Sequence, residues 1–110
     1  MRGPRVTLEQ WRTLQAVVDH GGYAQAAEAL HKSQSSISYT VAKLQEQIGM
    51  ELLHIEGRKA VLTSAGESLL QRSRHLIEHA IEIEQVAASL EQGWEAQVAL
   101  ATDAIFQSQS

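Results

Sequence analysis

A cluster of hydroxyl side chains lies at the start of a segment with helical apolar spacing. The stretch HKSQSSISYTVAKLQEQIG, residues 31–49, carries serines at positions 33, 35, 36 and 38, followed by Tyr39. Hydroxyl groups both donate and accept hydrogen bonds, so they can pair with base edges or phosphate oxygens. Short side chains also allow the backbone to approach a partner closely. The cluster therefore indicates a polar surface suited to a hydrogen-bonding ligand.

The helix that would position this cluster has one apolar face. Apolar residues recur at spacings of four, three and four, namely Ile37, Val41, Leu44 and Ile48. This spacing predicts a helix, and Ser33 is a suitable N-cap for it. At about 100° per residue, the opposite face carries Ser35, Ser36, Tyr39, Ala42, Lys43 and Glu46. The alternative is that the serines are only caps, but capping explains one serine and leaves three.

Two helical segments are expected before this one. Thr7 and Gln10 have the spacing of a capping box, and Gly21-Gly22 can end the helix that follows. Its predicted apolar face consists of Leu8, Trp11, Leu14 and Val18. A short alanine-rich segment runs from Tyr23 to Leu30, with Ala26, Ala27 and Leu30 expected to face inward. Two helices, a short turn and a helix with a polar leading end are the order of a helix-turn-helix.

A short hairpin with a basic tip is predicted after these helices. Residues 52–55 and 60–63 have the composition of two strands, and Glu56-Gly-Arg-Lys59 lies between them. Beside a helix-turn-helix such a hairpin is a wing, and Arg58 and Lys59 would then lie near a phosphate backbone. The alternative is an ordinary solvated turn.

Several motifs with their spacing resemble one family. They are Ala26-Ala-Glu28, Leu30-His31-Lys-Ser-Gln34, Ile37-Ser38, Leu44-Gln-Glu46, Gly49, Leu52 and Leu62-Thr63-Ser-Ala-Gly66-Glu67. Over about residues 7–92 the chain resembles the N-terminal part of LysR-type transcriptional regulators. These bacterial dimers or tetramers have a winged helix-turn-helix, a dimerising linker helix and a C-terminal effector domain. The resemblance implies that residues 34–43 form most of the recognition helix and that DNA is contacted by Gln34, Ser35, Ser36, Ser38, Tyr39 and Lys43.

The chain also departs from the family pattern. Ser35 replaces a common proline, and Gln25 lies where many members have a basic residue. Leu53-His-Ile55 replaces a usual Phe-x-Arg in the wing. Two basic positions are therefore missing, which predicts fewer phosphate contacts and either weaker binding or a shallower salt dependence.

A long helix is expected after the wing. Ser64-Ala-Gly-Glu67 has the spacing of a second capping box, and no helix breaker follows before Gln92. Residues at alternating spacings of four and three form a seam of Leu69, Ser73, Leu76, Ala80, Ile83, Ala87 and Leu90. A helix over residues 64–92 would be about 43 Å long, too long for so small a domain to cover. We therefore expect a homodimer whose helices meet at Leu69, Leu76, Ala80, Ile83, Ala87 and Leu90. The alternative is a helix folded onto its own domain.

The residues after Gly93 have a different pattern. The alternation in Trp94-Glu-Ala-Gln-Val-Ala-Leu-Ala-Thr102 predicts a strand. In the family this is where the effector domain begins, so we expect the chain to be the N-terminal part of a longer regulator. A small-molecule effector would then bind only in the missing C-terminal domain.

Composition limits the other functions to be considered. The net charge of −4 is uneven, because residues 1–66 hold seven basic and six acidic residues whereas residues 67–110 hold two and seven. Cysteine is absent, and no signal peptide or membrane span is apparent, which favours a cytoplasmic protein. Tyr39-x-x-x-Lys43 matches a dehydrogenase spacing without the glycine-rich turn that dinucleotides need. His75 and His79 are four residues apart with Glu78 and Glu82 close by, but no cysteine or third histidine has a matching local spacing, so a solvated helix face is the better interpretation. We expect no enzyme, no metal and no cofactor.

Together these patterns predict a mainly α fold, a winged helix-turn-helix followed by a long dimerisation helix. Residues 1–62 would form the DNA-binding domain, residues 63–92 the linker helix, and residues 93–110 the start of a truncated effector domain or a disordered tail. The expected function is a sequence-specific DNA-binding transcriptional regulator that binds double-stranded DNA as a homodimer, with a tetramer possible in the full-length protein. The alternative is a helical protein-interaction module that keeps the winged fold but does not bind DNA.

Overall fold

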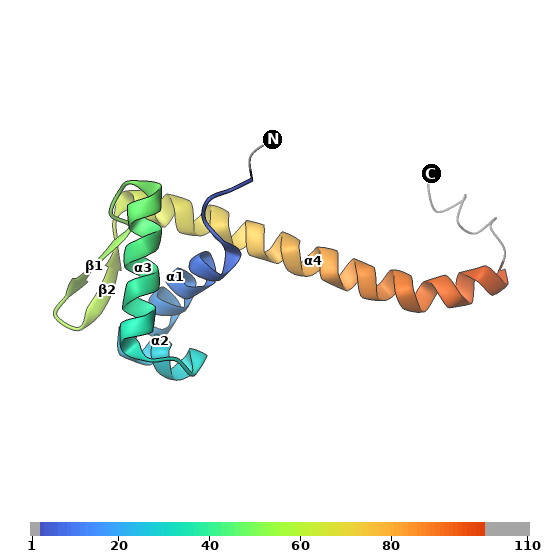
Figure 1. Cartoon of the computed structure of the whole chain (residues 1–110), viewed down its shortest axis with the longest axis horizontal. Helices are drawn as coiled ribbons and strands as arrows, with labels where there is room; N and C mark the ends of the chain where they lie inside the picture. Colours follow the sequence, from blue (N-terminus) through green and yellow to red (C-terminus); the bar gives the residue numbers. More distant parts are fainter. Residues whose placement is uncertain (1–2, 101–110) are drawn as a thin grey trace. The chain divides into compact units, whose positions relative to one another are not determined.

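The computed structural model describes residues 3–100, and the side chains of residues 3–92. It contains α1 (Leu8–His20), α2 (Tyr23–Leu30), α3 (Gln34–Ile48), β1 (Leu53–Glu56), β2 (Lys59–Leu62) and α4 (Ser64–Leu100). The chain divides into two compact units, Met1–Ile77 and Glu78–Ser110. The first unit holds the three short helices, the hairpin and the start of α4 (Figure 1). This element order confirms the predicted mainly α, winged helix-turn-helix fold.

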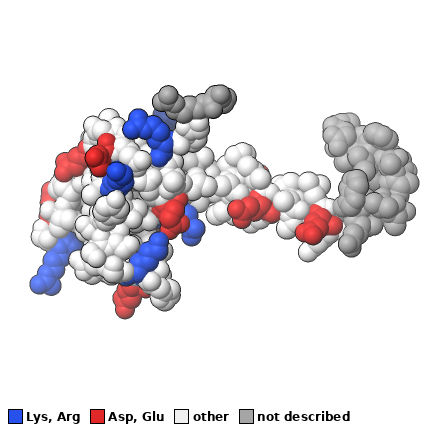
Figure 2. Space-filling model, viewed as in Figure 1, with Lys and Arg blue, Asp and Glu red and all other residues white. Residues whose placement is uncertain are grey.

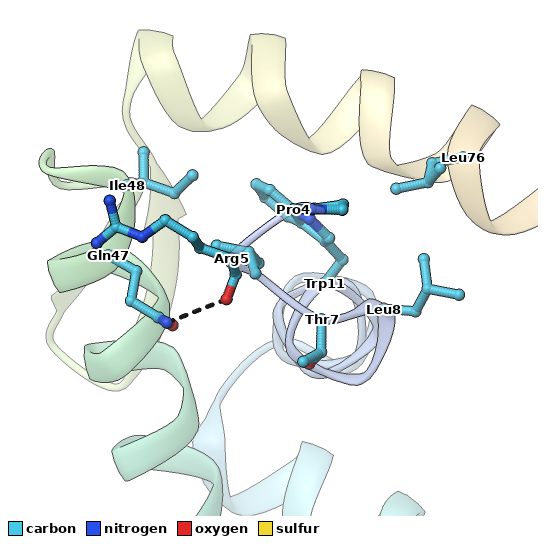
Figure 3. A pocket seen from close by; sticks show the side chains of 9 residues that line it. Pro4, Arg5, Thr7, Leu8, Trp11, Gln47, Ile48 and Leu76 are labelled. Carbon is cyan, nitrogen blue, oxygen red and sulfur yellow. Dashed lines mark hydrogen bonds between the residues drawn. The ribbon is translucent and has the colours of Figure 1, made fainter. Parts of the chain in front are cut away.

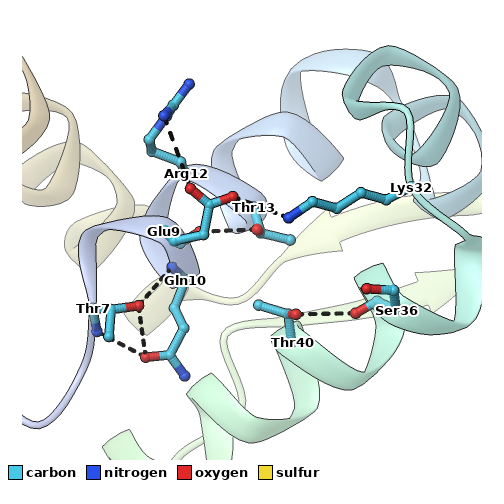
Figure 4. Close-up of polar contacts among 8 residues, drawn as sticks. All are labelled: Thr7, Glu9, Gln10, Arg12, Thr13, Lys32, Ser36 and Thr40. Atoms are coloured by element: carbon cyan, nitrogen blue, oxygen red, sulfur yellow. Dashed lines mark hydrogen bonds and ion pairs between the residues drawn. The ribbon is translucent and has the colours of Figure 1, made fainter.

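Helix α1 begins and ends as its sequence predicts. The Gln10 amide donates to Thr7 Oγ1 at 3.1 Å, and the Thr7 amide donates to Gln10 Oε1 at 2.8 Å, which completes the capping box (Figure 4). At the other end Gly21 has a φ of 91°, the left-handed conformation that glycine adopts without a steric cost. Both ends of α1 are therefore determined by local residue chemistry.

The core lies where α1, α2 and α3 meet. Its fully or nearly fully buried side chains include Leu14, Val17, Ala26, Ala27, Ile37, Val41 and Leu44. The buried face of α1 differs from the predicted one, because Thr13, Ala16 and Val17 are buried whereas Trp11 and Val18 are only partly covered and Leu8 is 42% exposed. The reason is that α1 contacts both α2 and α3, so it buries a wider stripe that is displaced toward its C-terminal half.

The turn between α2 and α3 depends on two residues. His31 has a φ of 58° and closes α2, a left-handed conformation that is uncommon for a residue other than glycine. Ser33 then caps α3, since its Oγ accepts from the Ser36 amide at 3.1 Å. The predicted capping role of Ser33 is confirmed.

The hairpin is antiparallel, and its strands are shifted by one residue from the predicted bounds. Leu53 pairs with Leu62, and Glu56 pairs with Lys59. Only Gly57 and Arg58 form the turn, and Gly57 has a φ of 66°. A two-residue turn with glycine at its first position matches the twist of the strands. The turn therefore sets the register and places Glu56 and Lys59 inside the strands.

Helix α4 begins against the base of the hairpin. Its cap is Thr63 and not the predicted Ser64, because Thr63 Oγ1 accepts from the Gly66 amide at 2.9 Å. The same hydroxyl donates to the Glu51 carbonyl oxygen, and the Thr63 amide donates to the Leu52 carbonyl oxygen. These tertiary contacts fix Thr63 one residue before the predicted cap.

The strand predicted from Trp94 to Thr102 is wrong where it can be compared, because α4 continues through Gly93 to Leu100. Positions 101 and 102 lie outside the described residues. A glycine inside a helix costs only about 1 kcal/mol, and the Ala, Glu, Gln and Leu residues beyond it favour a helix. Short alternation was therefore a weaker signal than helix propensity.

Within the described part of the chain, no helix is both long enough and apolar enough to cross a membrane.

Candidate nucleic-acid interface

The polar face of α3 lies on the surface of the winged unit. Ile37, Val41 and Leu44 point into the core, so the opposite side of the helix is left to solvent. All the α3 side chains proposed for DNA contact are exposed, namely Gln34, Ser35, Ser36, Ser38, Tyr39 and Lys43. Tyr39 is 69% exposed, although it is the largest of them. An exposed aromatic ring with a hydroxyl group is available to a partner and contributes nothing to the core.

The hydroxyl groups at the start of α3 differ in their hydrogen-bonding roles. Ser33 Oγ caps the helix and lies 3.3 Å from Ser35 Oγ. Thr40, one turn after Ser36, donates its hydroxyl to the Ser36 carbonyl oxygen at 3.0 Å (Figure 4). Lys43 forms an exposed ion pair with Glu46 at 3.8 Å, which partly offsets its charge. Ser33 is therefore structural, whereas the other serines border the exposed face.

Basic and acidic side chains are interspersed on the winged unit. Figure 2 shows blue Lys and Arg side chains beside red Asp and Glu side chains on the visible face of this unit. Four of the basic side chains are paired. Arg12 and Lys32 lie 3.9 Å and 3.2 Å from Glu9, Lys43 pairs with Glu46, and Arg74 lies 2.7 Å from Asp19. On this face any attraction for a polyanion must therefore come from particular basic residues and not from a large field of one sign.

A cleft of about 430 Å³ joins the start of α3 to the hairpin turn. It is lined by Tyr23, Ala24, Gln25, Gln34, Ile55, Gly57 and Arg58. The structure thus brings together two residues that the sequence singled out separately, Gln34 and Arg58. The sequence pointed to the first turn of α2 only through Gln25, which lies where many family members have a basic residue. The closeness of this turn to the hairpin was not predicted.

Glycine at position 22 allows the hairpin turn to lie close to α2. A Cβ atom there would lie 3.2 Å from the Arg58 carbonyl oxygen and 2.7 Å from Gln25 Oε1. The glutamine side chain can move away, but the backbone oxygen cannot move without the turn. Gly22 therefore helps to hold Arg58 beside the start of α3.

Tyr23 supplies a hydrogen-bond donor within this cleft. Burial raises the pKa of its phenol above the ordinary value of 10.0, because the charged form loses solvation. The phenol therefore stays protonated at neutral pH and can donate to an acceptor such as a phosphate oxygen. The other proposed wing residue, Lys59, is exposed at the start of β2 and does not line the cleft.

Comparison with known families identifies the fold. Residues 8–67 match the family described as bacterial regulatory helix-turn-helix protein, lysR family. The match extends from the start of α1 to the first turn of α4 and covers more than half of the chain. This chain is a member of the LysR family.

Curated relatives support the assignment to the LysR family. The chain is 35% identical over 100 residues to the probable HTH-type transcriptional regulator YhaJ of Escherichia coli K12, covering 91% of this chain and 34% of that protein. It is 40% identical over 85 residues to the RuBisCO operon transcriptional regulator of Allochromatium vinosum, covering 77% and 28%. The chain thus spans about a third of the length of these regulators.

Solved structures agree with the LysR fold. The complex of the CbnR DNA-binding domain with DNA superposes with a TM-score of 0.72 at 29% identity, covering 77% of this chain and 98% of that one. The complex of the BenM DNA-binding domain with catB site 1 DNA gives 0.76 at 24% identity, covering 79% and 94%. These relatives are transcriptional regulators and DNA-binding domains, which favours the regulator hypothesis over a protein-interaction module.

In the described residues, no group of three or more potential ligands could hold a metal ion.

The α4 helix of this LysR-family chain has two distinct faces. Leu70, Ser73 and Ile77 are buried, with exposures of 5%, 3% and 9%, so Ser73 faces its own unit and not a partner. Of the residues proposed for dimerisation, Leu76, Ile83 and Leu90 are 46%, 57% and 60% exposed. Leu69 packs partly against the core, Ala80 is partly buried, and Ala87 is exposed. The alternative of a helix folded onto its own domain thus holds for the turns of α4 up to Ile77.

An apolar groove of about 630 Å³ borders the exposed face of α4 at Leu76. It lies between the N-terminal segment, α1, the end of α3 and Leu76 (Figure 3). Gln47 holds the N-terminal segment in place, because its Nε2 donates to the Arg5 carbonyl oxygen at 3.1 Å. Leu8 and Leu76, both more than two-fifths exposed, lie along the same groove. The apolar surface around Leu76 therefore extends onto α1.

Proposed function

We propose that this chain is the DNA-binding and dimerisation part of a bacterial LysR-type transcriptional regulator that binds double-stranded DNA in a sequence-specific way. The observation that carries the proposal is the shared surface of the exposed α3 face and the hairpin turn, joined by the cleft between Gln34 and Arg58. The α3 helix would enter the major groove, where hydroxyl and amide groups can read base edges. The hairpin would follow the phosphate backbone.

Each proposed contact has a role that suits its chemistry. Gln34, at the start of α3, presents an amide that can pair with an adenine edge. The Ser36, Ser38 and Tyr39 side chains can donate to or accept from base edges, with Ser35 and Lys43 at the rim of the face. Arg58 and Lys59 would neutralise phosphates, and this neutralisation makes the affinity depend on salt.

The proposed assembly is a homodimer through α4. Ile83 and Leu90 continue the line of Leu76 along the helix, at intervals of seven residues, and all three are exposed. A second copy is the simplest cover for such a stripe. In the full-length regulator, a tetramer and a small-molecule effector bound to a further domain are consistent with this assignment, as is a cytoplasmic location.

The wing provides the test of DNA binding. Arg58→Ala with Lys59→Ala should weaken binding to all duplexes about equally and lower the salt slope by about one for each phosphate that is no longer neutralised. Fluorescence anisotropy with duplexes from the regulator's flanking intergenic DNA and with scrambled duplexes, over a range of salt concentrations, measures both quantities. Arg12→Ala is the control, because Arg12 is an exposed arginine of α1 outside the cleft.

Three results would contradict the proposal. A wild-type chain that shows no salt-dependent duplex binding would favour the protein-interaction alternative. An unchanged salt slope in the double variant would remove the wing from the phosphate backbone. A change only in the preferred sequence would mean that the wing reads bases.

A further inference from the structure

Two polar contacts join α1 to α4 outside the proposed DNA-contacting surface. Arg74 donates from Nη2 to Asp19 Oδ1 at 2.7 Å and from Nη1 to Asp19 Oδ2 at 3.2 Å. One turn earlier in α1, Gln15 Nε2 donates to Ser73 Oγ at 3.0 Å, and Ser73 Oγ donates to the Leu70 carbonyl oxygen at 2.7 Å. We call these four residues, Gln15, Asp19, Ser73 and Arg74, the α1–α4 latch.

The latch lies within the last part of α4 that belongs to the winged unit. That unit ends at Ile77, and α4 contributes buried side chains to it at positions 70, 73 and 77. With Arg74 these positions follow the spacing of one helical face. The two latch contacts therefore join this part of α4 to α1, and Leu70 also belongs to the buried core of the unit.

The proposed dimer face is separate from this held face. Leu76 lies one residue before Ile77, which is about 100° around the helix, and Ile83 and Leu90 continue the line of Leu76. The helix can therefore contact its own unit on one side and a second copy on another. Any tilt of α4 on α1 would move the recognition helix relative to that second copy.

We propose that Gln15 and Asp19 are positioning residues that set the half-site spacing which the dimer accepts on DNA. This inference rests on the proposed function, because it requires a dimer that binds two half-sites. Two parallel N–H···O bonds from a guanidinium to a carboxylate fix an orientation as well as a distance. Two half-sites are read together only if the two recognition helices keep a fixed separation.

Geometry explains why the latch could affect spacing without affecting folding. The Arg74 and Asp19 side chains are 39% and 50% exposed, and exposed ion pairs contribute little to stability. The start of α4 is held independently, because its cap Thr63 donates from its amide to the Leu52 carbonyl oxygen and from its hydroxyl to the Glu51 carbonyl oxygen. Loss of the latch would therefore leave α4 attached through its first turn and the buried Leu70 and Ile77 side chains, but without the paired bonds that fix its orientation on α1.

The test compares three variants on the full chain. Gln15→Ala with Asp19→Asn removes the latch, because the Nδ2 of an asparagine is a donor and cannot replace the second carboxylate oxygen that accepts from Arg74. Asp19→Glu keeps a carboxylate and should behave as the wild type does. Glu28→Gln is the control for the removal of negative charge, since Glu28 is an exposed carboxylate on α2.

Binding is measured on a single half-site duplex and on duplexes whose two half-sites are separated by different numbers of base pairs. The latch variant should bind the half-site duplex as the wild type does, while its preference for the best spacing falls about threefold or more. Asp19→Glu and Glu28→Gln should retain the preference. A latch variant with an unchanged spacing preference, or with equally weakened half-site binding, overturns the positioning role.

A second readout needs no DNA. The chain has no cysteine, so Ala29→Cys and Gln85→Cys introduce two sites for spin labels, and an excess of unlabelled chain restricts the measured pairs to those within one copy. The distribution of label–label distances should be broader in the latch variant than in the wild type, whereas Asp19→Glu should match the wild type, and an unchanged distribution overturns the inference. A wild-type chain that binds no duplex would instead refute the proposed function, and it would refute the spacing role as well, because that role requires DNA binding.

Discussion

At the scale of single residues, substitutions of Ser33 and Tyr39 in the same part of the chain are expected to have different effects. Ser33→Ala removes the acceptor of the Ser36 amide, so it should cost about 1 kcal/mol of unfolding free energy. Tyr39→Ala removes an exposed side chain of the same helix and should change stability by less than about 0.5 kcal/mol. Urea unfolding followed by circular dichroism measures both values.

DNA binding should show the opposite pattern for this pair. Tyr39→Ala should lose about 1–3 kcal/mol of discrimination between cognate and scrambled duplexes if Tyr39 contacts a base edge. Ser33→Ala should keep its discrimination at temperatures where the domain is folded. Equal stability losses in the two variants, with discrimination intact in both, would mean that the exposed face of α3 is only structural.

At the scale of elements, the junction between the wing and α4 depends on one glycine. In an open helix, Gly→Ala stabilises by about 1 kcal/mol. At Gly66 the added Cβ would meet the Leu52 carbonyl oxygen at 1.9 Å, so Gly66→Ala should destabilise by about 1–3 kcal/mol. Thermal unfolding of this variant shows directly whether the substitution stabilises or destabilises the chain.

A second glycine in the same helix provides the matched comparison. Gly93 lies within α4, and Gly93→Ala should increase the helical signal of the chain. If Gly66→Ala stabilises the chain as well, the close approach of α4 to the base of the hairpin is wrong.

At the scale of the whole molecule, the exposed stripe of α4 predicts the oligomeric state. Leu76→Glu with Ile83→Glu should convert a dimer into a monomer, because four buried carboxylates per dimer would have no partners. Sedimentation at micromolar concentration measures this. Gln71→Glu with Gln85→Glu adds the same charge at exposed positions off the stripe and should leave a dimer. A wild-type chain that is already monomeric would refute the dimer.

The sequence by itself determined those features that depend on a few consecutive residues. Local hydrogen bonds determine two helix starts, the capping box at Thr7 and the N-cap at Ser33. The end of α1 at Gly21 follows from the ability of glycine to adopt the left-handed conformation. The apolar spacing of α3 determined which of its sides faces the core, because burial of a helical stripe is a periodic property. The exposure of the polar serine face follows from the same periodicity.

Only the tertiary structure decided which distant residues meet. Gln34 and Arg58 line one cleft because Gly22 lets the hairpin turn lie close to α2. Thr63 caps α4 in place of Ser64 because it is held by the carbonyl groups of residues 51 and 52. Ser73 faces Gln15, although its heptad spacing suits a seam between copies. Periodicity shows that a helix has an apolar face, but the packing of other elements decides what covers each part of that face.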